Sequence, residues 1–147
     1  MNNTDFKIKG LVRVLISLIL VVHLMFFLLE AIFWMLPQVH NVLISLLDNP
    51  VTSTVPLQAL TLKNLFINQG FYNLFLVLAG VAGWRLIYSG KFAPGYVLLL
   101  FLCFSATGAG ITLALSTKAY ILAAMQALPA AITFILIYPA YQKSLKQ

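Results

Sequence analysis

Long apolar runs separated by short polar stretches dominate the pattern of this 147-residue chain. Four of the runs have the length of about 20 residues that an α-helix needs to cross the hydrocarbon core of a bilayer. They cover residues 12–36, 66–88, 96–115 and 119–138. The first run follows a basic lead, "KIKGLVR", but it is too long for a signal peptide and no small-residue cleavage site follows it. The pattern therefore predicts an all-α integral membrane protein with four transmembrane helices in a single domain, residues 1–147.

The connections between the predicted spans indicate how the helices are arranged. Those after the second and third spans are short, so consecutive helices should be antiparallel neighbours in an up-down-up-down four-helix bundle. The first connection, residues 37–65, is longer. Within it, residues 41–47 ("NVLISLL") are predicted to lie flat at the interface as a helix, and residues 48–56 ("DNPVTSTVP") to form turn and extended chain. We expect His40 and Asp48, which belong to this connection, to be solvated.

The basic residues predict the orientation of the bundle. One face would carry the two termini and the second connection, with Lys7, Lys9, Arg13, Arg85, Lys91, Lys143 and Lys146. The opposite face would carry Lys63 and Lys118. Because positively charged loops stay in the cytoplasm, both termini are predicted to be cytoplasmic. The expected location is a cell membrane, such as the bacterial inner membrane, with the lipid bilayer as the main partner.

Composition excludes several classes of protein. With 62% hydrophobic and 8% charged residues, the chain has too little charge for a soluble domain of its size, since about a quarter of ordinary residues are charged. The basic residues form no patch, so no nucleic-acid partner is expected. The single cysteine, Cys103, can form neither an intrachain disulfide nor a zinc site. We expect no metal and no cofactor, and haem is disfavoured because His23 is the one histidine within a predicted span.

The first span contains two ionisable side chains, His23 and Glu30. At 100° per residue they differ by about 20° around the helix, so they share a face. An ionisable group within a membrane is costly when it faces lipid, and it indicates a functional site by default. We therefore expect both side chains to point into the bundle, with His23 near the midplane and Glu30 nearer the outer surface.

The other spans add carboxamides to the same, outer half of the bundle. Gln69 and Asn73 share a face of the second span because four residues separate them, and Tyr72 lies next to Asn73 in sequence. Gln126 comes about two turns into the fourth span. These positions predict a polar intramembrane pocket lined by His23, Glu30, Gln69, Tyr72, Asn73 and Gln126.

Three segments together resemble a known family of small four-span membrane proteins of bacteria and fungi, domain of unknown function 1304. They are "HLMFFLLEAIFWMLP" (residues 23–37), "NQGFYNLFLVLAG" (68–80) and "MQALPAAITFIL" (125–136). The positions that match the family pattern are His23, Glu30, Asn68, Gln69, Gly70, Tyr72, Asn73, Gln126 and Pro129. This sequence departs from the pattern at Leu74 and Ala127, where glycine is usual, and at Val22, where an acid often precedes the histidine. The resemblance implies the four-span fold but transfers no activity.

Three functions fit these residues. The first is a pocket for a small or lipid-like molecule, in which Glu30 and His23 are candidate catalytic residues for acid–base chemistry such as isomerisation. The second is a small proton-coupled transporter, as a homodimer, that uses Glu30. The third is a non-catalytic accessory protein whose polar residues only hold the helices in register. The residues favour the ligand pocket among these three functions.

Overall fold

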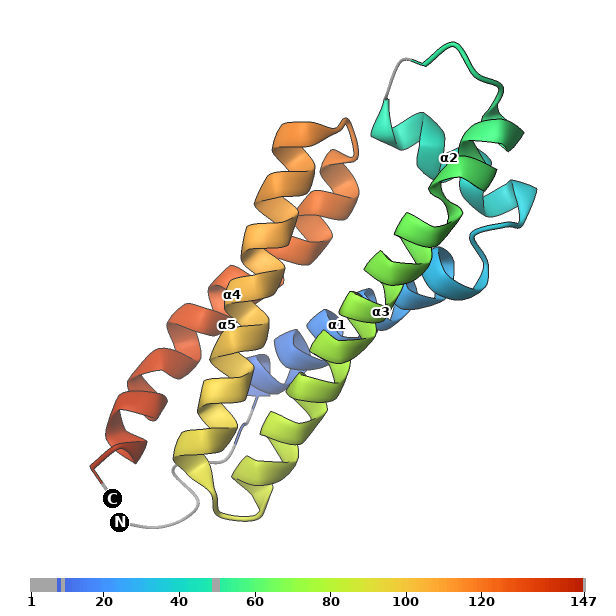
Figure 1. Cartoon of the computed structure of the whole chain (residues 1–147). Coiled ribbons are helices and arrows are strands. Elements are labelled where there is room, and N and C mark those ends of the chain that lie inside the picture. Colours follow the sequence, from blue (N-terminus) through green and yellow to red (C-terminus); the bar gives the residue numbers. More distant parts are fainter. Residues whose placement is uncertain (1–7, 9, 49–50, 147) are drawn as a thin grey trace.

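The computed structural model describes residues 8, 10–48 and 51–146, and the regular structure of this part of the chain is entirely helical (Figure 1). In chain order the elements are α1 (Gly10–Phe27), the π-helical turn η2 (Leu28–Ile32), α2 (Pro37–Leu47), α3 (Val55–Tyr88), α4 (Phe92–Ser116) and α5 (Tyr120–Ser144). By length and composition, α1 with η2, α3, α4 and α5 are long and apolar enough to cross a membrane. The prediction of four spans is confirmed.

The spans form an up-down-up-down bundle, as expected. Helix α4 packs along α3 and α5, and α1 packs against α3 and α5. One end of the bundle, which we call the termini end, is closed by a cluster of buried side chains that includes Ile16, Ile87, Leu99 and Ile137. The opposite end, the α2 end, holds η2, α2 and the connection between α4 and α5, and α3 and α4 diverge toward it (Figure 1). Which end faces the cytoplasm stays a prediction from the basic residues.

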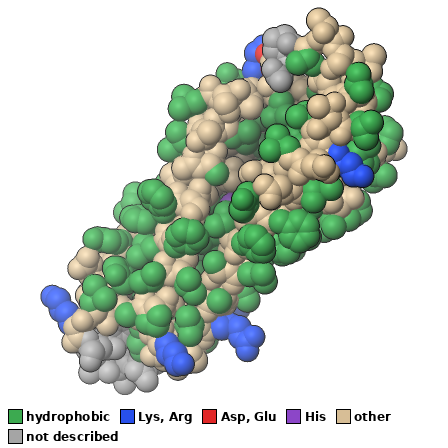
Figure 2. Space-filling view, in the orientation of Figure 1, with side chains coloured by type: hydrophobic (Ala, Val, Ile, Leu, Met, Phe, Trp, Pro, Cys, Tyr) green, Lys and Arg blue, Asp and Glu red, His purple; other side chains and the backbone are tan. Residues whose placement is uncertain are grey.

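The outer surface of the bundle is apolar, as a lipid-facing surface should be. Large side chains such as Phe104, Leu115 and Ile135 are 70%, 83% and 70% exposed. Apolar side chains cover the face in Figure 2, whereas Lys and Arg lie near its two ends. Hydrophobic side chains that face outward along whole helices match the hydrocarbon of a bilayer.

The helix boundaries differ from the predicted spans at the α2 end. Helix α3 begins at Val55, well before residue 66, because Pro56 occupies its first turn, where a missing N–H costs no hydrogen bond. Its 34 residues correspond to about 51 Å, which exceeds the roughly 30 Å of a hydrocarbon core. The first span stops at Ile32 rather than at residue 36, and the helix predicted for residues 41–47 is confirmed but begins at Pro37.

The extra turns of α3 hold α2 through four residues that we call the Trp34 cluster: Trp34, His40, Ala59 and Phe66. The indole N–H of Trp34 donates to the carbonyl of Ala59 at 2.8 Å. Its ring stacks on Phe66, with centroids 3.6 Å apart. The Nδ1–H of His40 donates to the carbonyl of Trp34 at 3.1 Å. The expectation that His40 is solvated is therefore wrong, because α2 folds back and buries it against α3.

Candidate functional site

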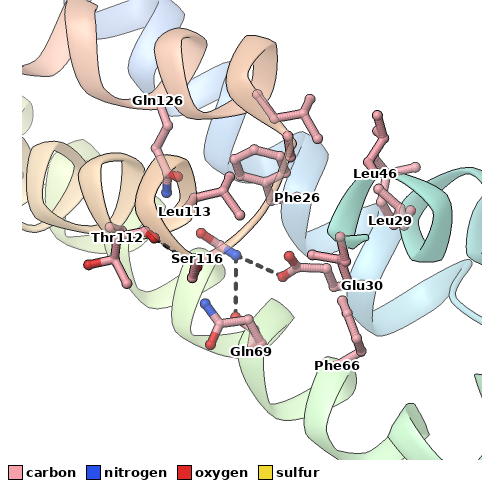
Figure 3. A pocket seen from close by; sticks show the side chains of 16 residues that line it. Phe26, Leu29, Glu30, Leu46, Phe66, Gln69, Thr112, Leu113, Ser116 and Gln126 are labelled. Carbon is pink, nitrogen blue, oxygen red and sulfur yellow. Dashed lines mark hydrogen bonds between the residues drawn. The ribbon is translucent and has the colours of Figure 1, made fainter. Parts of the chain in front are cut away.

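A cavity of about 310 Å³ lies at the α2 end of the bundle, where α3 and α4 diverge. All five α-helices, η2 and the α4–α5 connection contribute to its wall. The lining residues are Phe26, Leu29, Glu30, Leu43, Leu46, Leu47, Phe66, Gln69, Asn73, Ala109, Thr112, Leu113, Ser116, Ala119, Leu122 and Gln126. Figure 3 shows Glu30, Gln69 and Gln126 approaching this space from different helices. Apolar walls with a few convergent polar groups are typical of sites for small molecules.

Glu30 lies in the π-helical turn η2. The turn closes with a hydrogen bond from the backbone N–H of Phe33 to the carbonyl of Leu28, at 2.8 Å. Gly70 lets α3 pack directly on this turn, because a Cβ atom at Gly70 would lie 2.8 Å from Ala31 Cβ and 3.2 Å from Glu30 Cβ. Single π-helical turns within α-helices occur frequently at functional sites. The turn and the glycine together aim the Glu30 carboxyl group at the cavity.

Asn73 connects Glu30 to α3. Its side-chain Nδ2 donates to Glu30 Oε2 at 2.9 Å and to the backbone carbonyl of Gln69 at 3.3 Å. Asn73 is buried, whereas the side chain of Gln69, one turn earlier, is exposed to the cavity. Within the described residues, the hydrogen bond from Asn73 is the one that the Glu30 carboxyl group makes.

His23 lies behind Gln126 rather than in the cavity wall. Its Nδ1–H donates to the carbonyl of Ile19 at 2.8 Å, so Nε2 of the neutral ring is left as the acceptor. The side-chain Nε2 of Gln126 lies 3.5 Å from this atom. His23 is fully buried and Gln126 is 6% exposed. The imidazole therefore orients the Gln126 carboxamide, which in turn lines the cavity.

The structure thus brings four of the six predicted pocket residues, Glu30, Gln69, Asn73 and Gln126, to one cavity. His23 does not line it, but contacts two residues that do, Gln126 and Phe26. Tyr72 lies outside the cavity, because adjacent positions of an α-helix point about 100° apart and Tyr72 directly precedes Asn73. The Tyr72 side chain is 55% exposed and packs edge-on against Phe75.

Sequence reasoning missed two parts of the wall. Thr112 and Ser116 line the cavity from α4, and their spacing of four residues was the available signal. The α2 leucines, Leu43, Leu46 and Leu47, also line it. Their three- and four-residue spacing predicts an apolar helix face, but not that α2 folds back over the bundle.

One ion pair joins α2 to the other side of the cavity. Lys118, in the α4–α5 connection, contacts Asp48 at the end of α2, and no other ion pair occurs among residues 8, 10–48 and 51–146. The hydrogen bond and the charge of Asp48 raise the pKa of Lys118. A raised lysine pKa means that the pair persists at neutral pH and is lost only as the pH rises through that pKa.

Replacing Asp48 with Asn is therefore expected to loosen α2 without unfolding the bundle. Both side chains are at least half exposed, so the effect on global stability should be small. Hydrogen–deuterium exchange of the α2 amides should become faster, and high salt should have the same effect on the wild type. Unchanged α2 exchange in the variant would show that the ion pair does not hold the helix.

Comparison with known proteins places these residues in a family. No curated protein and no solved structure matches the chain. The model of one protein family, described as "Protein of unknown function (DUF1304)", matches residues 17–138. The match includes most of all four spans and every residue of the cavity wall. The chain belongs to the DUF1304 family of proteins.

Proposed function

We propose that this protein binds a small amphiphilic molecule from the bilayer in the cavity at the α2 end. The observation that carries the proposal is the convergence of Glu30, Gln69, Asn73 and Gln126 on one space of about 310 Å³ with otherwise largely apolar walls. A volume near 300 Å³ is at the lower end of the range of ligand pockets. The polar groups would bind a headgroup and the leucines of α2 an apolar tail.

The empty space argues against polar residues that only hold helices in register. Side chains with that role pack against each other, because protein interiors are close-packed. Here the Gln69 carboxamide forms no hydrogen bond within the described residues, and it borders the cavity. A group of this kind is available for a ligand.

The opposite half of the bundle favours binding over transport. The clusters around Ile16, Leu99 and Leu102 fill the bundle from its middle to the termini end with apolar side chains. A proton path through such packing would need a continuous row of polar groups. Among the buried side chains of these clusters, Tyr96 carries the one hydroxyl group. A proton flux into liposomes that is abolished by Glu30→Gln would support transport instead.

The proposed location is a cell membrane with the cavity on the outer side. This follows from the cytoplasmic termini that the basic residues predict, because the cavity lies at the end away from the termini. A cysteine-labelling experiment on the α4–α5 connection in intact cells tests this orientation.

Filling the cavity is expected to remove the ligand. Ala109 lines the cavity from α4, and Ala109→Phe would occupy it with a ring. Ala124 is an exposed alanine of α5 outside the cavity, so Ala124→Phe is the matched control. Native mass spectrometry of gently purified protein should find a bound molecule in the wild type and in Ala124→Phe, but not in Ala109→Phe. Equal occupancy in both variants, or an empty wild type, would contradict the proposal.

A further inference from the structure

The hydrogen-bond donors of the cavity are mostly used within the protein. Asn73 has two side-chain N–H groups; one donates to Glu30 and the other to the carbonyl of Gln69. Its side-chain oxygen remains as an acceptor. The Glu30 carboxyl group uses Oε2 for Asn73, so its second oxygen also remains.

His23 fixes the orientation of the Gln126 carboxamide. Since Nδ1 of His23 donates to Ile19, the ring presents an acceptor at Nε2, and Gln126 must turn its NH₂ group toward it. This arrangement leaves the carbonyl oxygen of Gln126 for the cavity. The histidine thus makes the carboxamide an acceptor toward a ligand.

The hydroxyl groups of α4 also use their protons within the protein. Thr112 donates to the carbonyl of Gly108 at 3.0 Å, and Ser116 donates to the carbonyl of Thr112 at 2.7 Å. Each hydroxyl proton is therefore directed into the helix, and the oxygen lone pairs remain. Gln69 is the exception, because its carboxamide offers both donors and an acceptor.

The charge of the cavity wall also favours a ligand that donates hydrogen bonds. Glu30 is the ionisable residue among the lining residues, and no lysine, arginine or histidine is among them. A carboxylate or phosphate headgroup would meet oxygen acceptors and a like charge there. A headgroup that consists of donors and carries a positive charge would satisfy the free oxygens and neutralise Glu30.

We infer that the ligand is an amphiphile with a protonated primary amine, whose three N–H groups are shared among the free oxygens of Glu30, Asn73, Gln126 and the α4 hydroxyls. This inference rests on the proposed function and names its ligand class. The alkyl part would lie against Leu43, Leu46 and Leu47, which form the wall on α2. Figure 3 shows Leu29 and Leu46 on the other side of Glu30 from Gln126 and Thr112.

Four compounds with the same octyl chain test the headgroup: octylamine, octyltrimethylammonium, octanol and octanoate. Direct binding of radiolabelled octylamine would be measured on the protein in phosphatidylcholine nanodiscs, with empty nanodiscs subtracted, and the other three used as competitors. We expect octylamine to bind at least about tenfold more tightly than octyltrimethylammonium, which has the charge but no N–H, and than the other two. Equal competition by all four would overturn the inference while leaving an amphiphile pocket in place.

Two variants place the amine in this cavity. Glu30→Gln keeps an oxygen for Asn73 but removes the charge, and it should weaken octylamine binding at least about tenfold, a larger loss than for octanol, which carries no charge. Thr112→Val removes one acceptor and should weaken octylamine about threefold. Thr107→Val is its matched control, because Thr107 makes the same kind of bond to Cys103 but does not line the cavity. Octylamine binding that is insensitive to Glu30→Gln would overturn the inference.

Two further results separate the possibilities. Competition by phosphatidylethanolamine added to the nanodiscs would identify the amine as that of a lipid headgroup, whereas no competition would indicate a free amine. If none of the octyl compounds binds and the purified protein contains no ligand, both the inference and the proposed function fail.

Discussion

Replacing Trp34 with Ala is expected to lower the free energy of unfolding by about 3–5 kcal/mol. Trp34 is 1% exposed, stacks on Phe66 and donates its indole N–H to Ala59. The truncation would leave a void between η2 and α3 and remove the partner of the Ala59 carbonyl. It would also remove the support of Phe66, which lines the cavity. The variant should therefore lose ligand as well as stability.

Cys103 provides the measurement. It is the single cysteine of the sequence and is fully buried in the bundle, so a thiol-reactive dye labels it only when the bundle opens. Unfolding would be followed by this labelling in mixed micelles. Trp34→Phe is the control, because it keeps an aromatic ring against Phe66 and loses the hydrogen bond and only part of the indole volume, for a smaller expected loss of about 1–2 kcal/mol. Equal stability of Trp34→Ala and the wild type would show that the Trp34 cluster does not hold the fold.

The four spans could be predicted because each depends on a local property of the chain. A run of apolar residues long enough to cross a bilayer must form a helix, since lipid offers no partner for backbone groups. Short connections then determine the antiparallel order. The docking of α2 depends instead on the burial of Trp34 and His40 against α3, and no local pattern shows that contact.

In the candidate site, too, some residues could be placed from the sequence and others could not. Positions four residues apart on a regular helix share a face, and this spacing correctly placed Gln69 with Asn73. The 100° rule for His23 and Glu30 crosses η2, where the helix widens. The prediction that both residues line the cavity therefore holds for Glu30 but not for His23, which lies behind Gln126. Gly70 of α3 lies directly against the π-helical turn, and sequence spacing does not predict this contact.

A substitution at the contact between α4 and α5 is also expected to lower the stability of the protein strongly. Gly110 lies where the two helices meet, and a Cβ atom there would lie 2.7 Å from Ala127 Cβ and 2.8 Å from the carbonyl oxygen of Ala123. Atoms of the backbone cannot move aside as a flexible side chain can, so the helices would have to separate. We expect Gly110→Ala to lower the free energy of unfolding by about 2–3 kcal/mol, as overpacking does elsewhere.

Gly108 provides the matched control, because it lies on the same helix and a Cβ atom there would have nothing within 4 Å. Both substitutions replace glycine by alanine within α4, so any gain in helix propensity, about 1 kcal/mol, is common to both. Gly108→Ala should therefore be as stable as the wild type or slightly more so, and the difference between the variants isolates the α4–α5 contact. Cys103 labelling measures both variants in one assay. Equal unfolding of the two would mean that α4 and α5 do not approach each other this closely, and the cavity wall that joins Thr112 to Gln126 would then need a different geometry.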